Sequence, residues 1–192
     1  YNAYTLFNTF GGAMQILAMM LFFPLLRKFM STIQVFYTSF AMAILGYMVL
    51  LALMFVNMSN LYLLFIPAFF IFAANGMLCV LTTVFLANTV DYGQWENDRR
   101  DESVIFSMQT FVVKLASGVA ALVASICLTV CNLSQNTDVA ITAASQSVAG
   151  LRITMTVFPI VGLLIAVFYF RKKYILTEEK VEKIAQAIKE NQ

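Results

Sequence analysis

Five long apolar runs dominate this sequence and most limit what it can fold into. They cover residues 1–23, 33–56, 61–87, 104–131 and 149–170. Each is close to the roughly 20 apolar residues that a helix needs to cross a bilayer, and none shows the strict alternation of a membrane β-strand. With 61% hydrophobic and 11% charged residues, the chain lacks the polar surface of a soluble fold. The sequence therefore predicts an all-α membrane protein with five transmembrane helices.

Basic residues are placed on one side of this predicted bundle. They follow the first, third and fifth runs, whereas the loops 57–60 and 132–150 contain neither Lys nor Arg. These residues are Arg27, Lys28, Arg99, Arg100, Arg171, Lys172 and Lys173. Because short loops rich in Lys and Arg stay in the cytoplasm, we expect these three ends and the C-terminus to be cytoplasmic.

The last residues form a second region with a different composition. Residues 1–170 are predicted as the transmembrane bundle and residues 171–192 as a cytoplasmic amphipathic tail. In the tail, Thr177 precedes Glu178 and Glu179, which suit the first turn of a helix, and apolar residues recur with helical spacing. This helix can lie on the membrane or dock on cytoplasmic loops, and its narrow apolar face without aromatic residues favours docking.

Lys114 is the most costly residue inside a predicted span. It lies eleven residues past Ser103, about 16 Å into the membrane at 1.5 Å per residue. A Lys at the centre of a span costs about 2.5 to 3.5 kcal/mol on insertion scales. None of the ten acidic residues of the chain lies deep in a span. We therefore expect Lys114 to face a cavity, a ligand or a carboxylate outside this chain.

Polar residues also share faces with helical spacing in three of the five spans. The fourth carries Ser103, Ser107, Thr110, Lys114, Ser117, Gly118, Ala121 and Ser125, the first Tyr4, Asn8, Gly11 and Gln15, and the third Asn75, Thr82 and Thr89. Such stripes favour a polar pathway lined by these three helices. The alternative is close helix packing, for which small residues are also suited.

The segment "ANTVDYGQWENDRRDESVIFSMQTFVVKLASG", residues 87–118, resembles a known family of transporters. Its phrases "DYG", "RDES" and "SMQTFVVK" are similar to the junction of helices ten and eleven in the glycoside-pentoside-hexuronide:cation symporters. This family is the melibiose-permease branch of the major facilitator superfamily. "FFPLLRKF" and "YILTEEKVEKI" extend the resemblance over nearly the whole chain. It implies that the five spans are helices 8 to 12 of a twelve-helix fold.

The resemblance also implies site residues. The match to "QTxxxK" assigns Gln109, Thr110, Val113 and Lys114 to the sugar site and to its link with the cation. Cys79 stands where the melibiose-permease branch presents a Trp, and we add Thr82 and Asn8 from the polar stripes. The candidate substrate-binding residues are thus Lys114, Thr110, Gln109, Val113, Cys79, Thr82 and Asn8.

The charged stretch at residues 88–103 suggests a cytoplasmic gate. Asp91, Arg99, Arg100 and Glu102 flank two helices that would move during transport, and ion pairs among them would hold the cytoplasmic side shut. The alternative is a hydrated loop. Two departures from the family weaken the gate hypothesis, because Asn88 and Gln94 stand where the family has acidic residues.

The functional prediction is sugar:cation symport by alternating access, with a glycoside, pentoside or hexuronide as substrate. The alternatives are symport of a lysolipid or other amphiphile, and a five-helix structural subunit. An enzyme is not expected, because the chain has no His and no recognisable nucleophile motif.

The expected partners are a sugar, membrane lipid and an N-terminal half of the same protein, with no nucleic acid. No metal site or cofactor is expected, and the coupling cation, Na⁺ or H⁺, would bind mainly in that other half. The first residue is Tyr1 and the first span begins at once, which suggests part of a longer chain. We expect an integral protein of the inner (plasma) membrane.

Overall fold

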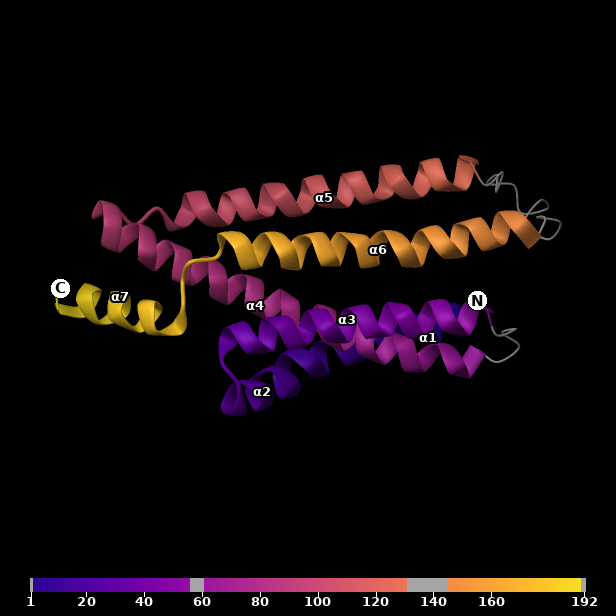
Figure 1. Ribbon diagram of the computed structural model, residues 1–192, viewed down its shortest axis with the longest axis horizontal. Coiled ribbons are helices and arrows are strands. Elements are labelled where there is room, and N and C mark those ends of the chain that lie inside the picture. Colours follow the sequence, from indigo (N-terminus) through magenta and orange to yellow (C-terminus); the bar gives the residue numbers. More distant parts are fainter. Residues whose placement is uncertain (1, 56–60, 131–144, 191–192) are drawn as a thin grey trace.

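The computed structural model describes residues 2–55, 61–130 and 145–190, and these residues form helices and short connections (Figure 1). The helices are α1 (Asn2–Leu17), α2 (Phe23–Phe29), α3 (Thr32–Phe55), α4 (Phe65–Asn97), α5 (Glu102–Val130), α6 (Ser145–Lys173) and α7 (Glu178–Glu190). A π-helical turn, Ala18–Phe22, joins α1 to α2, and a 3₁₀ turn, Leu61–Leu64, precedes α4.

The described residues contain five helical stretches that are long and apolar enough to cross a membrane. They are Thr5–Phe29, Thr32–Leu53, Tyr62–Asn97, Glu102–Val130 and Arg152–Lys173. The first runs through α1, the π-helical turn and α2. For the described residues, the prediction of an all-α fold with five helices long enough to span a membrane is confirmed. The numbering of these helices as 8 to 12 stays a prediction.

The π-helical turn, Ala18–Phe22, lies directly before α2, whose second residue is Pro24. Proline has no backbone N–H and its ring crowds the carbonyl four residues earlier. A wider turn at this point accommodates the ring without ending the helix. The first span therefore stays continuous until Met30, whose extended backbone ends it.

Helix α4 is longer than the sequence predicts. The third apolar run ends at residue 87, and the following polar residues were expected to form a loop, but α4 continues to Asn97. Polar and charged residues are compatible with a helix once it has left the apolar part of the membrane. The helix ends because Asp98 adopts the left-handed conformation, with φ 52° and ψ 23°. The connection to α5 is thus reduced to residues 98–101.

Helix α4 lies at the centre of the packing, with α1 on one side and α3 on another, while α3 also packs on α6. The α1–α4 contact is close, since a Cβ on Gly76 would lie 2.5 Å from the carbonyl oxygen of Gln15. The α3–α4–α6 contact is aromatic: the rings of Phe36 and Phe170 are 4.1 Å apart, and Phe85 joins them. These contacts make α1, α3, α4 and α6 one packed body.

Helix α5 is different, because no residue of Glu102–Val130 is buried. It lies beside α4 and α6. In Figure 1 it forms one edge of the bundle and is joined to α4 at one end. Nearly all of its surface is therefore free to meet lipid or another protein.

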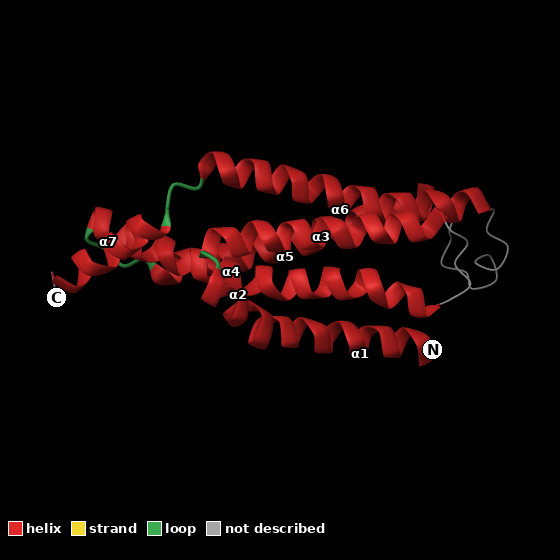
Figure 2. Ribbon diagram, turned by 60° about the horizontal axis from the view of Figure 1, so that its bottom comes forward, coloured by secondary structure: helices red, strands yellow, loops and turns green. Residues whose placement is uncertain are grey.

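The charged connections gather at one end of the bundle, which we call the charged end. Figure 1 places α2, the α4–α5 connection and α7 toward this end and the N-terminus at the other. Figure 2 shows the long helices running along one axis, with α7 and the C-terminus at the charged end. Two groups of basic residues lie at this same end. They are Arg27 and Lys28 in the last turn of α2, and Arg171, Lys172 and Lys173 in the last turn of α6. The predicted placement of these three ends on one side agrees with this arrangement.

Candidate functional site

The polar face of α5 is built from hydroxyl side chains and one amine. The hydroxyls of Ser107, Thr110 and Ser117 each donate to the backbone carbonyl four residues earlier, over 2.6 to 3.0 Å. Their oxygen lone pairs remain as acceptors. Lys114 adds three N–H donors to the same face. This face can therefore both accept hydrogen bonds and donate them with a positive charge.

Lys114 is exposed and forms no ion pair within the part of the chain that the structure describes. An ammonium group that lies within an apolar span is costly unless it meets water, a carboxylate or a ligand. What Lys114 contacts in the whole protein stays a prediction.

The other predicted substrate-binding residues are spread over three helices. On α5, Thr110 and Val113 are exposed and Gln109 is half-buried. Cys79 and Thr82 are exposed on α4, and Asn8 is exposed on α1. Among the described residues, no hydrogen bond or ion pair joins α1, α4 and α5 through these side chains. The structure thus leaves all of them accessible but does not bring them together into one polar cluster.

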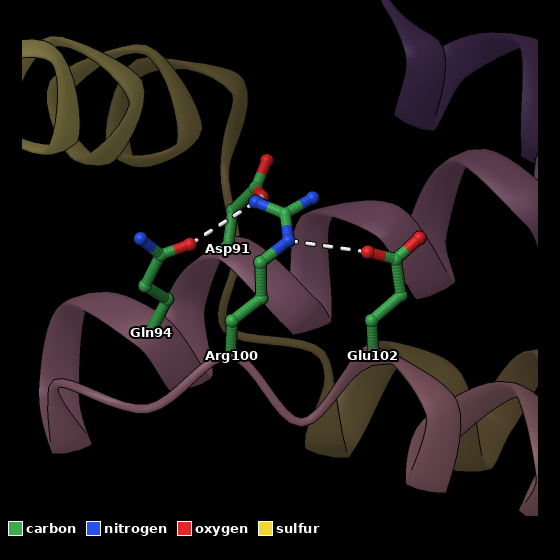
Figure 3. Close-up of polar contacts among 4 residues, drawn as sticks. All are labelled: Asp91, Gln94, Arg100 and Glu102. Carbon is green, nitrogen blue, oxygen red and sulfur yellow. Dashed lines mark hydrogen bonds and ion pairs between the residues drawn. The ribbon is translucent and has the colours of Figure 1, made fainter.

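Three of the four predicted gate residues do come together at the charged end (Figure 3). Arg100 Nη1 lies 3.6 Å from Asp91 Oδ1, and Arg100 Nε donates to Glu102 Oε2 over 3.1 Å. Arg100 Nη1 also donates to Gln94 Oε1 over 3.1 Å. These residues connect the last turns of α4 with the first turn of α5 across the connection 98–101. We call Asp91, Gln94, Arg100 and Glu102 the Arg100 cluster.

Gln94 is the member that sequence reasoning missed. It was counted as a departure that weakens a gate, because it replaces an acidic residue, yet its side-chain oxygen accepts from Arg100. Its position three residues after Asp91 on the same helix could have indicated this contact. Arg99 is exposed and forms no ion pair among the described residues.

A second set of contacts at the charged end fixes α7. The side chains of Leu176 and Ile184 are buried, and α7 packs on α4. The backbone N–H of Thr32, which starts α3, donates to the carboxylate of Glu178. This hydrogen bond lowers the pKa of Glu178 below its ordinary value, and the nearby Arg27 acts in the same direction. Of the two alternatives for the tail, the structure shows the docked one.

The chain was compared with families of known proteins and with individual curated proteins. Residues 1–178 match the family described as MFS/sugar transport protein. The lactose permease of Lactobacillus delbrueckii subsp. bulgaricus is 32% identical over 189 residues, which are 98% of this chain and 28% of the permease. The chain thus spans little more than a quarter of that relative.

Two further relatives are shorter matches. The raffinose carrier protein of Pediococcus pentosaceus is 32% identical over 123 residues, 64% of this chain and 19% of the carrier. An uncharacterized symporter of Bacillus subtilis, YjmB, is 25% identical over 128 residues, 67% of this chain and 27% of the symporter. These relatives are named as a permease, a carrier and a symporter, and none of them is an enzyme. With five membrane-length helices and a family match over nearly its whole length, the chain belongs to the MFS/sugar transport protein family.

Proposed function

We propose that this chain is part of a sugar:cation symporter that works by alternating access. Its five long helices form part of the C-terminal half, as helices 8 to 12 of twelve, and pack against an N-terminal half. The charged end and α7 then lie in the cytoplasm, because short basic loops stay on that side of the inner (plasma) membrane. The names of the relatives, a lactose permease and a raffinose carrier, favour a sugar over a lysolipid as the substrate.

The exposed Lys114 on α5, which forms no ion pair among the described residues, is the observation that carries this proposal. Helix α5 buries none of its residues in this chain, so its polar face is free to line a pathway between two halves. Substrate sites in this type of transporter lie near the midplane between the halves. In our proposal Lys114 pairs with a carboxylate of the other half, and this pairing links occupancy of the cation site to occupancy of the sugar site.

The other candidate residues take supporting roles in this proposal. Thr110 offers an acceptor to a sugar hydroxyl, since its own hydrogen is already donated to Phe106. Gln109 and Val113 line the same part of α5, and Cys79, Thr82 and Asn8 line the facing helices. The coupling cation, Na⁺ or H⁺, binds mainly in the other half. Within the described residues there is no group of three His, Cys, Asp or Glu side chains that could hold a metal ion.

The test is sugar uptake by the full-length protein in cells that lack other carriers for lactose and raffinose. Lys114→Gln should lower accumulation against a gradient at least about tenfold, because an unpaired partner charge costs several kcal/mol. Exchange of sugar without net cation movement should fall less. Val119→Ala is the matched control, since Val119 is exposed on the opposite face of α5 and should leave uptake unchanged.

Two results would contradict the proposal. Coupled uptake that is the same in Lys114→Gln as in the parent protein would remove the role of Lys114. A full-length protein that moves no sugar but transports a lysolipid would favour the alternative substrate class. A protein that moves neither would favour the structural subunit.

A further inference from the structure

Helix α7 is attached to the bundle at two separate places. At its first turn, Glu178 accepts a hydrogen bond from the backbone N–H of Thr32, at the start of α3. Further along, Lys180 Nζ lies 5.4 Å from the centre of the Tyr92 ring, near the end of α4. Leu176 and Ile184, which belong to the tail itself, are buried. The tail therefore joins the start of α3 to the last turns of α4.

The residues that α7 contacts on α4 are next to those that Arg100 contacts. Asn88 lines a cavity of about 140 Å³ with Tyr174 and Glu178 of the tail region. Asn88, Asp91 and Tyr92 are spaced i, i+3 and i+4, so they share one face of the helix. The same face thus meets Lys180 of α7 through Tyr92 and meets Arg100 through Asp91, while Asn88 faces the cavity that Glu178 also lines. The close-up in Figure 3 shows this part of α4 with the Arg100 cluster.

Beyond the buried Val90 and the half-buried residues 91–94, the end of α4 has few other supports. Residues 95–97 are exposed, and the connection 98–101 that follows them is exposed as well. A segment with few buried contacts opens easily unless neighbouring elements hold it. The contacts of α7 and of Arg100 on this shared face are therefore expected to act on one unit, the end of α4.

We propose that α7 is an intramolecular clasp whose docking holds the end of α4 and thereby supports the pairing of Arg100 with Asp91. Docked, the clasp keeps Asp91 positioned for Arg100 and favours the closed state of the cytoplasmic side. Undocked, the end of α4 frays, the Arg100 cluster loosens, and the equilibrium shifts toward the open state. The effect on transport rests on the proposed function, whereas the docking and its effect on α4 do not.

The contacts that attach α7 to the bundle are of a kind that can break and form again. Lys183 and Glu179 form an ion pair on α7 itself, and their side chains are 72% and 80% exposed. The outer face of α7 is therefore already hydrated when the helix is docked. Undocking exposes the buried Leu176 and Ile184 and breaks the contacts of Glu178 and Lys180, and it does not require the membrane-spanning helices to separate.

Amide hydrogen exchange of the full-length protein tests the clasp in two regions, residues 178–190 and residues 90–97. Glu178→Ala removes the acceptor for Thr32, and Ile184→Ser weakens the buried anchor. Both variants should speed exchange in both regions by about fivefold or more, as expected for the loss of a charge-assisted hydrogen bond or an apolar anchor. Glu179→Ala is the matched control, because it removes the same charge from the same turn without a contact to the bundle.

The outcomes separate the clasp from the transport function. Unchanged exchange at residues 178–190 in both variants would overturn the docking. Faster exchange there with unchanged exchange at residues 90–97 would overturn the coupling to α4. Sugar uptake is measured in parallel, and the two variants should change its initial rate while Glu179→Ala does not. If the full-length protein moves no sugar, the exchange results still decide the clasp.

Discussion

Arg100 shows how much one residue can organise at the charged end. Its guanidinium reaches Asp91, Gln94 and Glu102, which come from two helices. The sequence predicted the two carboxylates, because opposite charges near a connection are expected to pair. It did not predict Gln94, since a neutral amide gives no charge signal and its contact depends on where α4 ends.

Replacing Arg100 tests whether the Arg100 cluster acts as a gate. Each exposed contact contributes about 1 kcal/mol or less, so three together should bias a two-state equilibrium by about tenfold. Arg100→Gln should therefore raise the fraction of full-length protein that is open to the cytoplasm, measured by accessibility to a labelling reagent from each side. Arg99→Gln removes the neighbouring charge, which forms no ion pair among the described residues, and should leave the ratio unchanged. Equal ratios in both variants would refute the gate.

Asp98 has a conformation that most residues avoid. Its φ of 52° lies in the left-handed region, which Gly and, less readily, Asp and Asn adopt. Asp98→Gly should leave the thermal stability equal or slightly higher, whereas Asp98→Val should cost about 1 to 2 kcal/mol. Thermal unfolding in detergent measures both, and equal melting temperatures for the two variants would contradict this reading of the helix end.

At the scale of elements, the contact between α1 and α4 depends on Gly76. A methyl group there would meet the backbone oxygen of Gln15 at 2.5 Å, and a backbone atom can move only if a whole helix moves. Gly76→Ala should therefore lower the stability by about 1 to 3 kcal/mol. Gly93→Ala on the same helix meets nothing within 4 Å and should raise the stability by about 0.5 to 1 kcal/mol. A melting temperature that changes in the same direction in both would count against this close contact.

The elements that the sequence predicted well are those with a single physical signal. An apolar run of about 20 residues has few alternatives to a membrane helix, so all five spans were predicted. The extension of α4 to Asn97 was not, because polar residues outside the membrane are compatible with both helix and loop. The π-helical turn before Pro24 was missed for a similar reason, since Pro also suits the first turn of a new helix.

At the scale of the whole molecule, the candidate site is only partly predictable from this chain. The sequence placed Lys114 and Thr110 on one face of a helix, and the structure leaves both exposed there. Among the described residues no carboxylate pairs with Lys114, so in our proposal its partner lies in the other half. The proposed site lies between two halves, and this chain covers 28% of the related lactose permease.

The docking of α7 should depend on pH through Glu178. Its pKa is lowered by the hydrogen bond from Thr32, so the docked state favours the charged carboxylate. The stabilisation is therefore fully present above the ordinary pKa of Glu, about 4.3, and is lost as the pH falls through the lower pKa of the docked state. Exchange of α7 amides, corrected for intrinsic rates, should rise at acidic pH in the parent protein. Glu178→Gln removes this titration, and an identical pH profile in that variant would contradict the assignment.

The lack of any buried residue in α5 also bears on how such a protein is assembled. Helices α3, α4 and α6 and the π-helical turn after α1 contribute to two adjoining apolar clusters, and α1 packs on α4, so these four helices can associate as soon as they are in the bilayer. Helix α5 carries a charged residue, Lys114, deep in its apolar span and contributes no buried residue to a core. It is therefore held chiefly by α4 and α6, its neighbours in sequence. With the proposed N-terminal half as the source of the partner of Lys114, we expect α5 to be the last helix to settle, when that half arrives. A defect in that partner would then be seen first as early proteolysis within α5, before any loss of the four-helix core.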